Sequence, residues 1–447
     1  MNGVAGQLSA AGMSRTEAAA KGRLFERALR AMPEGNTSRF PLRGYYVPGR
    51  IEVLGKHTDY GGGRSLLCAV EKGFCLVARE RADSQVHVIN ARSRSCCVLA
   101  LDPMLQMPDL QWCTYPATVA RRLARNFPGA RRGAEIAFLS DLPAASGMSS
   151  SSAFMVAVYL ALAGINQLSD FDEYQREIRG LEDLTGYLGT VENGQSFGTL
   201  AGDHGVGTFG GSEDHTAILC CRGGELRQYS FCPIRLERAI AWPEGLALVV
   251  GVSGIVAMKT GAARDRYNHA SLSARAVLQA WRAATGRDDP TLASAIASAP
   301  NAPDRLRNIL RLSDDEEYGA PALMSRFEHF LDESTAIIPS AADALVSGDL
   351  EQFGSWVDRS QSGAENLLGN QVPETIALAR SARALGALAA SAFGAGFGGS
   401  VWALVKAGEA REFVRAWASA YRNRFPGTHQ ARFFSTRPGP AAQSLAL

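Results

Sequence analysis

Short runs of apolar, β-branched and aromatic residues, each ended by polar turn residues, dominate the chain between residues 45 and 101. Runs of this length and composition predict strands. The expected strands lie at residues 45–47, 51–54, 74–79 and 86–91, with another at 135–139. The front of the chain is therefore expected to be mainly extended.

Farther along the chain, apolar residues recur at helical spacing. The expected helices are residues 24–32, 118–126, 153–164, 173–191, 266–285, 321–338, 340–346, 350–358 and 374–385. In the helix expected at 173–191, Leu181, Leu184 and Leu188 share a face, and the helix delivers Glu192 at its end. Three more strands are expected at residues 216–220, 246–251 and 400–406.

The length of the chain, 447 residues, exceeds what one hydrophobic core usually supports, so two domains are expected. A break near residues 232–243 marks the boundary between them. The first twenty residues are small and polar, which predicts a frayed terminus. The expected organisation is a flexible tail at 1–20, an N-terminal domain at 21–237 and a C-terminal domain at 238–447.

Charge and cysteine content exclude several classes of protein. Charged residues make up 20% of the chain and the net charge is +2, so the basic surface of a nucleic-acid-binding protein is missing. None of the eight cysteines forms a CxxC pair or a zinc-type cluster, which favours reduced thiols in the cytoplasm. The first residues lack the apolar segment of a signal peptide, and apolar runs such as 153–163 are too short to span a bilayer. A cytoplasmic protein that binds neither nucleic acid nor membrane is expected.

The most informative segment is residues 47–63, which reads VPGRIEVLGKHTDYGGG. It places a cation, a histidine, an acid and a phenol behind a short apolar strand and ends in three glycines. Polar side chains at a strand end can fan into a pocket, and glycines let the backbone approach a ligand closely. The segment therefore points to a site for a polyhydroxylated ligand.

A second segment combines a strand, a loop and an apolar helix over residues 135–164. Gly147 followed by Ser149, Ser150, Ser151 and Ser152 at the helix start offers unpaired N–H groups and the positive end of the helix dipole, an arrangement that suits phosphate. Serine hydroxyls also suit Mg²⁺, a cation that prefers oxygen ligands. The alternative is an ordinary helix cap. No Gly-Lys-Ser/Thr follows, so the segment is not a common P-loop.

Two shorter patterns are weaker. Residues 394–399 read GAGFGG, which marks either a turn or a backbone surface that approaches another backbone or a bound phosphate. Asp214 follows two glycines within residues 210–215 and either points into a cleft or serves a turn.

In this order, these motifs resemble the GHMP small-molecule kinases, and specifically the galactokinase branch. Residues 48–60 with Gly62 are similar to the signature that opens galactokinases. Residues 142–151 resemble the family's ATP-phosphate loop, and residues 394–399 resemble its C-terminal glycine motif. Weaker likenesses lie at residues 192–193, 211–215, 267–268 and 326–362. The likeness covers the chain from about residue 45 to about residue 405.

The resemblance implies an α+β protein with the two-domain GHMP kinase fold. Its N-terminal domain would be like ribosomal S5 domain 2, and its C-terminal domain would be ferredoxin-like with added helices. The activity implied is transfer of the γ-phosphoryl group of ATP to a sugar, at the anomeric hydroxyl, giving a sugar 1-phosphate. ATP, Mg²⁺ and a small-molecule sugar are thus the expected partners, and a monomer is favoured.

The resemblance also implies roles for individual residues. Asp214 would take or orient the proton of the attacking hydroxyl, and Arg50 would favour the ionised form of Asp214 and stabilise charge on the transferred group. The residues implied to cradle the ATP phosphates are Gly147, Met148, Ser149, Ser150, Ser151 and Ser152. Those implied to hold Mg²⁺ are Ser150 or Ser151 with Glu192, and those implied to contact the sugar are Lys56, His57, Asp59, Gly211 and Tyr267. Simpler interpretations remain open: Arg50 as a salt-bridge partner at a strand edge, Asp59 as a turn residue, Tyr267 as a core residue.

The chain departs from the family's pattern at several positions. Lys56 stands where galactokinases carry Glu, which leads to the hypothesis of a sugar with an anionic group there, such as a uronic acid; the alternative is that Lys56 turns outward and pairs with an acid. Glu52 and Gly61 stand at Asn positions, and residues 391–393 lack the family's arginine. The segment at 194–211 is longer than expected and is either a lid or a surface insertion.

Two other functions remain open at this stage. One is a sensor that binds sugar and ATP without turnover, and the other is a kinase for a non-sugar alcohol such as mevalonate. The HTDY quartet at residues 57–60 favours the sugar branch.

Overall fold

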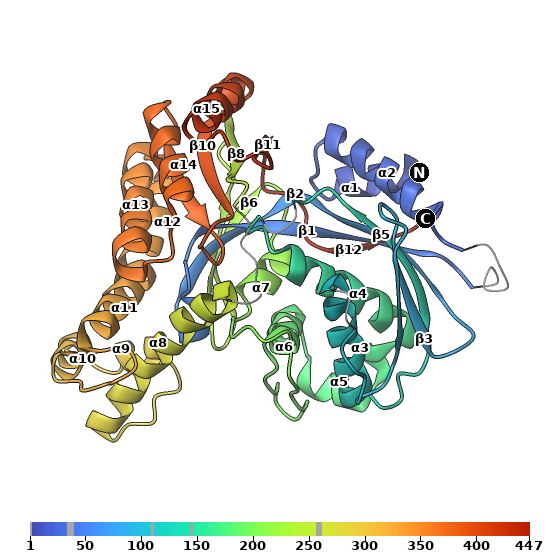
Figure 1. The fold of residues 1–447 in the computed structure, drawn as a ribbon, viewed down its shortest axis with the longest axis horizontal. Helices are drawn as coiled ribbons and strands as arrows, with labels where there is room; N and C mark the ends of the chain where they lie inside the picture. The colour runs from blue at the N-terminus through green and yellow to red at the C-terminus, as the bar shows by residue number, and fades with distance from the viewer. Residues whose placement is uncertain (1, 34–39, 109–110, 144–145, 256–261) are drawn as a thin grey trace.

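The computed structural model describes residues 2–33, 40–108, 111–143, 146–255 and 262–447. Within these residues the chain forms two sheets, each covered by helices (Figure 1). The first sheet has eight strands in the order β12-β1-β2-β5-β3-β4, with β6 paired to β2 and β7 to β6. The second has four strands in the order β11-β8-β10-β9. The α+β class is confirmed.

The first sheet is built around two long antiparallel strands, β1 (Arg43–Leu54) and β2 (Arg64–Glu80). The other strands are β3 (Gln85–Asn90), β4 (Cys96–Ala100), β5 (Ala134–Ser140), β6 (Glu225–Ser230), β7 (Arg235–Ala241) and β12 (Gln443–Leu445). The strands expected at 45–47 and 51–54 form one strand in the structure. A β-bulge, seen as a shift of the pairing register between Pro48 and Arg50, lies at the point where they join. Such a bulge lets a strand pass through a proline and a glycine without ending.

Successive side chains of these strands face opposite layers of helices. Val47 and Leu76 belong to the main core, whereas Tyr46 and Cys75, one position earlier in each strand, belong to a second cluster beneath the N-terminal helices. Because side chains alternate between the two faces of a strand, the sheet is buried on both sides. This explains why every residue of β1 from Gly44 to Leu54 is buried, polar residues included.

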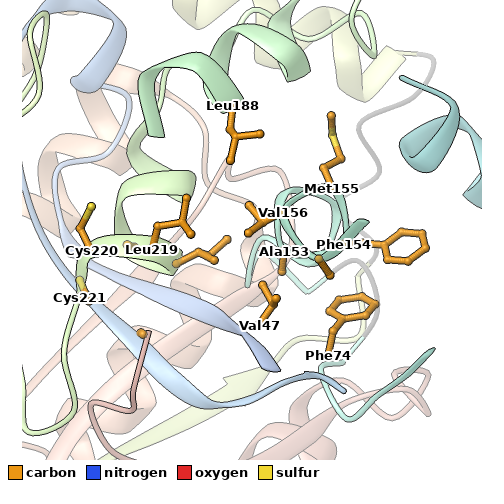
Figure 2. Packing of buried hydrophobic residues seen from close by; sticks show 14 of the residues in the cluster. Val47, Phe74, Ala153, Phe154, Met155, Val156, Leu188, Leu219, Cys220 and Cys221 are labelled. Atoms are coloured by element: carbon orange, nitrogen blue, oxygen red, sulfur yellow. The ribbon is translucent and has the colours of Figure 1, made fainter. Parts of the chain in front are cut away.

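The main core lies between the first sheet and α4 (Ser150–Asn166), as Figure 2 shows. The rings of Phe74 on β2 and Phe154 on α4 stack with their centroids 5.3 Å apart. The surrounding helices are α3 (Thr114–Asn126), α5 (Asp172–Glu177), α6 (Leu181–Asn193) and α7 (Glu213–Cys220). Since neighbours surround α4 on all sides, it is apolar around its whole circumference.

Two expectations for this region are wrong. Residues 216–220, expected as a strand, belong to helix α7, which packs against α6, α4 and β1. A short apolar run does not distinguish a buried strand from a buried helix, and the acids Glu213 and Asp214 in the first turn favour the helix. The single helix expected at 173–191 is two helices, α5 and α6, separated around Gly180.

The expectation of a flexible tail at 1–20 is also wrong. Helices α1 (Asn2–Ala10) and α2 (Arg15–Leu29) cover the face of the first sheet opposite α4 (Figure 1). Val4 and Leu8, four residues apart on one helix face, are fully buried there, and Lys21 of α2 donates to Asp141 beyond β5. Among the small residues that suggested disorder only the alanines favour a helix, so the first helix depends on docking through its two apolar anchors.

The second sheet consists of β8 (Leu246–Val252), β9 (Ala389–Phe393), β10 (Ser400–Lys406) and β11 (Arg432–Thr436). Its helices are α8 (Ala262–Thr285), α9 (Leu292–Ala297), α10 (Ala302–Arg311), α11 (Ala320–Asp332), α12 (Ile338–Ser347), α13 (Leu350–Gly363), α14 (Pro373–Ala384) and α15 (Ala410–Arg424). The sequence analysis missed the short strand β9, so the GAGFGG motif joins two strands rather than a helix and a strand.

The chain changes from the first sheet to the second between β7 and β8, near the expected break. It then returns, because β12 pairs with β1 and the backbone oxygen of Ala446 accepts a hydrogen bond from Gln7 at 3.0 Å. The two ends of the chain therefore meet at the first sheet, and the division at residues 237 and 238 stays a prediction. In the described parts of the chain, no helix combines the length and apolarity needed to cross a bilayer.

We expect Leu8→Ala to lower the free energy of unfolding by about 2–5 kcal/mol, because it removes a fully buried anchor of α1. The matched control is Gly6→Ala on the exposed face of the same helix, where an added Cβ meets no other atom. That change should be neutral or stabilise by about 0.5–1 kcal/mol. Urea unfolding curves measure both. Equal stability of Leu8→Ala and wild type would contradict the docking of α1.

Candidate active site

A cavity of about 1500 Å³ opens between the two sheets. Its walls include the bulged part of β1, the loop before α4, the end of α6, the start of α7 and the loop between β9 and β10. The candidate site residues that line it are Arg50, His57, Asp59, Gly147, Ser149, Ser150, Ser151, Glu192, Gly211, Asp214 and Tyr267. We call this cavity the cleft. Segments from most of the chain length thus converge on one place.

The centre of the cleft is an ion pair between Arg50 and Asp214. The Nε and Nη2 atoms of Arg50 lie 2.8 and 2.7 Å from Oδ1 of Asp214, and Nη1 donates to the backbone oxygen of Gly147 at 2.5 Å. Arg50 is only 4% exposed. Burial acts to lower the pKa of Arg50, but Asp214 and Glu52 opposite it raise this pKa above its usual value. The guanidinium therefore stays charged and connects the acid to the loop before α4.

Local structure fixes both partners of this pair. The bulge in β1 brings Gly49 so close to that loop that an added Cβ would lie 2.8 Å from the Met148 oxygen, and the Arg50 N–H donates to the same oxygen. Asp214 lies in the first turn of α7, which anchors it to the core. The side chains meet because β1 and α7 pack directly against each other.

The loop before α4 has the features of a phosphate site. Gly147 and Ser149 have positive φ angles of 76° and 56°, so the chain turns sharply and the N-terminus of α4 faces the cleft. The Ser149 hydroxyl is buried and, among the described residues, has no hydrogen-bond partner. Ser150 and Ser151 line the cleft beside it. Ala144 and Ala145, earlier in the same predicted motif, lie outside the described residues.

Two residues of the predicted cradle have other contacts. Met148 is fully buried in the main core. Ser152 is buried as well, and its hydroxyl lies 2.6 Å from Oε2 of Glu192 and 3.3 Å from Oδ2 of Asp214. Ser152 therefore connects two acids of the cleft instead of lining the cleft itself.

The glycine motif at 394–399 packs backbone to backbone against the loop before α4. A Cβ on Gly394 would lie 2.7 Å from the Gly147 oxygen, and one on Gly147 would lie 3.1 Å from the Phe393 oxygen. This is the close approach that was one of two interpretations of the motif. The second sheet thereby closes one side of the phosphate loop.

Oxygen donors suited to a divalent cation lie at the same end of the cleft. Glu192, Ser150 and Ser151 all line it, and Mg²⁺ commonly binds one or two carboxylates together with phosphates. The orphaned Ser149 hydroxyl adds a further oxygen. Across the described ranges no group of three or more His, Cys, Asp or Glu is placed to hold a metal ion.

The other end of the cleft carries Asp59, His57 and Tyr267. Oδ2 of Asp59 accepts from the Glu213 N–H at 3.0 Å, and burial raises the pKa of Asp59. The rings of His57 and Tyr267 lie 5.3 Å apart. Gly211 has to be a glycine, because a Cβ there would lie 2.2 Å from Oδ2 of Asp59. These groups form a polar wall with a glycine floor.

Both nitrogens of His57 already have protein partners. Nδ1 lies 3.0 Å from the Tyr60 hydroxyl and Nε2 lies 3.1 Å from the Ala395 oxygen. A backbone oxygen only accepts, so Nε2 carries the proton and Nδ1 accepts from Tyr60. Burial raises the pKa of Tyr60 to about 12, so its hydroxyl remains a donor. His57 thus bridges the signature segment and the glycine motif.

Lys56 does not enter the cleft. It is fully buried, and its ammonium donates to the hydroxyls of Ser360 at 3.2 Å and Ser391 at 2.9 Å. Ser360 in turn donates to Glu333, which also accepts from the Gly55 N–H. Neither the hypothesis of an anionic sugar held by Lys56 nor the outward-facing alternative fits this placement. The cation instead joins the signature segment to α13 and β9.

One part of the segment at 194–211 is bound to α3, and its last part lines the cleft. The side chain of Asp203 is buried, and its carboxylate lies 2.8 Å from Nε of Arg121 on α3. Farther along, Thr208, Gly210 and Gly211 line the cleft. A Cβ on Gly210 would lie 2.5 Å from the Tyr267 hydroxyl, so this end of the segment is fitted to the cleft.

Sequence reasoning missed two groups that line the cleft. The first is a wall of aromatic residues next to the phosphate loop: Phe74, Trp112, Tyr115, Phe138 and Phe154. They come from β2, from residues 112–115, from β5 and from α4, and nothing in the local sequence links these four segments. The second is the carboxyl group of Glu213, whose position directly before Asp214 was the available signal; Glu52, which also lines the cleft, was noted in the sequence only as a departure from the family's pattern.

Comparison with known proteins agrees with this geometry. Residues 37–80 match the galactokinase galactose-binding signature, residues 114–184 match the GHMP kinases N terminal domain, and residues 341–423 match GHMP kinases C terminal. Galactokinase of Chloroflexus aggregans is 29% identical over 399 residues, which cover 87% of this chain and 90% of that protein. Galactokinase of Chloroflexus aurantiacus is 29% identical over 389 residues, covering 85% and 88%.

A similar fold is seen in the crystal structure of Lactococcus lactis galactokinase complexed with galactose. It has a TM-score of 0.75 and 22% identity, and the match covers 94% of this chain and 98% of that one. A mevalonate kinase matches with a TM-score of 0.51 and 12% identity, covering 89% and 99%. These likenesses establish a common fold.

We expect Lys56→Met to lower the free energy of unfolding by about 3–5 kcal/mol, because it leaves the buried Glu333 carboxylate without a nearby cation. The control is Lys406→Met, whose ammonium pairs with Glu409 at the exposed surface and should contribute under about 1 kcal/mol. Denaturant unfolding measures both. Equal effects of the two substitutions would contradict the buried role of Lys56.

Proposed function

Since the chain belongs to the GHMP kinase superfamily, we propose that it transfers the γ-phosphoryl group of ATP to the anomeric hydroxyl of a galactose-like sugar. The observation that carries the proposal is the position of Arg50, which contacts both Asp214 and the backbone of the loop before α4. One guanidinium thus joins an acid to an anion cradle. The product is a sugar 1-phosphate.

The phosphates of ATP bind at the N-terminus of α4. The N–H groups there, the positive end of the helix dipole and the Ser149 hydroxyl, to which no described residue bonds, all favour an anion. Ser150, Ser151 and Glu192 would hold Mg²⁺, which would neutralise phosphate charge. The aromatic wall beside this loop, with Trp112 and Phe154 in it, offers flat apolar surfaces for the adenine ring.

The sugar binds at the opposite end, against Asp59 and Tyr267 over the floor at Gly211. Because Lys56 points away from the cleft, the placement of its side chain does not favour an anionic sugar, and the galactose-binding signature over residues 37–80 favours galactose. The relatives named galactokinase support the same choice. A kinase acting on a neutral sugar is therefore favoured over one acting on a uronic acid.

The transfer step needs a base and a positive charge, and the cleft offers both. Asp214 accepts the proton of the anomeric hydroxyl while that oxygen attacks the γ-phosphorus, and the bond to the oxygen bridging the β- and γ-phosphates breaks. ADP leaves with the electron pair of that bond. Arg50, held by Asp214 and Gly147, stabilises the negative charge of the transferred group. A cytoplasmic monomer stays a prediction.

We expect sugar-dependent release of ADP when the protein is incubated with ATP, Mg²⁺ and galactose. A panel that contains galactose, glucose, galacturonic acid and mevalonate, followed by a coupled ADP assay, tests the proposal. Galactose should give the highest kcat/KM, and galacturonic acid should be at least about tenfold poorer, because the Lys56 ammonium is bonded to Ser360 and Ser391 and does not line the cleft. Thermal stabilisation by galactose without ADP release would indicate a sensor, and preference for mevalonate would overturn the sugar assignment.

We expect Asp214→Asn to lower kcat by about 10²–10⁴, because the amide cannot accept the hydroxyl proton. Nucleotide affinity, measured by calorimetry, should stay within about threefold of wild type, since the phosphate loop is unchanged. The control is Asp289→Asn, another arginine-paired aspartate that does not line the cleft, which should keep wild-type kinetics. Unchanged turnover in Asp214→Asn would show that Asp214 is not the base.

A further inference from the structure

Two further acids lie beside the Arg50–Asp214 pair. Glu52 follows Arg50 by two positions on β1, and Glu213 directly precedes Asp214 on α7. Both line the cleft and both are deeply buried, Glu52 to 3% exposure and Glu213 to 6%. The proposed transfer step uses neither of them, so their presence there needs a separate explanation.

The contacts of these acids leave one oxygen without a donor. Oε2 of Glu213 accepts from the Ser65 hydroxyl at 2.8 Å, and Oε2 of Glu52 accepts from the Gly394 N–H at 3.3 Å. Oε1 of Glu52 is buried, and no N–H or hydroxyl group of the described residues donates to it. The carboxyl groups of Glu52 and Glu213 are within hydrogen-bonding reach of each other. A hydrogen bond between two carboxyl groups requires a proton on one of them.

The charges around the pair favour keeping that proton. The groups that face it are Arg50, Lys56, Asp59, Tyr60 and Asp214. Arg50 is already paired with Asp214, and Lys56 reaches Glu333 through the Ser360 hydroxyl. Two ionised carboxylates side by side would add two negative charges to a buried site that also contains Asp59. Buried like charges of this kind normally retain a proton.

We propose that Glu52 and Glu213 share one proton at neutral pH and, as an acid pair, position Arg50 for phosphoryl transfer. The proposal rests on the function proposed above for the Arg50–Asp214 site. Nη2 of Arg50 lies 4.0 Å from Oε2 of Glu52 but 2.7 Å from Oδ1 of Asp214. With the pair singly charged, Asp214 and the Gly147 oxygen hold the guanidinium towards the phosphate loop. Loss of the shared proton would add a second negative charge behind Arg50 and draw it away from that loop.

Burial of Glu52 and Glu213 favours their protonated forms as well. It raises the pKa of Glu52 to about 7 and the pKa of Glu213 well above its usual value. Because these folded-state pKa values lie above those of the unfolded chain, the folded protein binds more protons at neutral pH. The free energy of unfolding should therefore be highest near pH 5 and fall as pH rises through 7.

The first test does not depend on catalysis. It compares melting temperatures of wild type, Glu213→Gln and Glu52→Gln between pH 5 and pH 8, with Glu71→Gln as the control, a buried glutamate that pairs with Arg437 away from the cleft. We expect wild type and the control to lose more stability over this range than either cleft variant, since a glutamine donates the hydrogen bond without titrating. Parallel curves for all four proteins would overturn the acid pair.

Infrared spectra provide a second readout without a substrate. Wild type at pH 6 should show a carbonyl band of a protonated carboxyl group that disappears as pH rises and is missing in Glu213→Gln or Glu52→Gln. The control Glu71→Gln should keep the band. If one cleft variant fails to fold, the other variant and the pH titration of wild type still test whether the two acids share a proton. A wild-type spectrum without that band at pH 6 would contradict the shared proton.

The last test joins the pair to the kinase activity. Above the pKa of the pair, kcat/KM of wild type should fall about tenfold per pH unit. In Glu213→Gln this fall of kcat/KM at alkaline pH should be absent. If kcat/KM of Glu213→Gln fell at alkaline pH just as it does in wild type, the pair would not position Arg50. If the protein turned over no sugar while the melting curves and the carbonyl band behaved as expected, the proposed function would fail and the acid pair would stand.

Discussion

A buried arginine needs a negative partner, and this requirement organises the cleft. Arg50 is removed from water by the second sheet, so its charge has to be met by Asp214, 164 positions away in the sequence. The partners meet because the strand that carries Arg50 and the helix that carries Asp214 share one core with α4. A disturbance of that core would therefore act on the chemistry as well as on stability.

Close approach of backbones is the second constraint. Gly49, Gly147 and Gly394 lie where the bulge of β1 meets two loops, and a methyl group on any of them would crowd a backbone oxygen or a neighbouring side chain. The same contacts place the N-terminus of α4 beside Arg50. The glycines thus allow the two sheets to approach closely enough to enclose the phosphate loop, which lowers the local dielectric and strengthens every charge interaction there.

The charged groups of the site are divided between two compartments. Lys56, Glu333 and Ser360 form a buried connection between the signature segment and the second sheet, whereas Arg50, Asp59 and Asp214 face the cleft. Glu52 and Glu213 lie at the border of the two. This division explains how a segment rich in ionisable residues can serve both as a structural joint and as a binding wall, although its residues are adjacent along the chain.

The sequence by itself identified the groups of the proposed chemistry. These are the signature at residues 47–63, the serines at the start of α4 and Asp214, which are recognised from their residue types and local order. It also determined most strands and helices, since these depend on local periodicity. Only the tertiary structure decided that residues 216–220 are helical, that residues 2–20 are docked and that Lys56 faces inward. The same holds for the meeting of Glu52 with Glu213. Each of these outcomes depends on neighbours that are distant in sequence, and burial, which sets both the direction of a side chain and its protonation, exists only once the chain is folded.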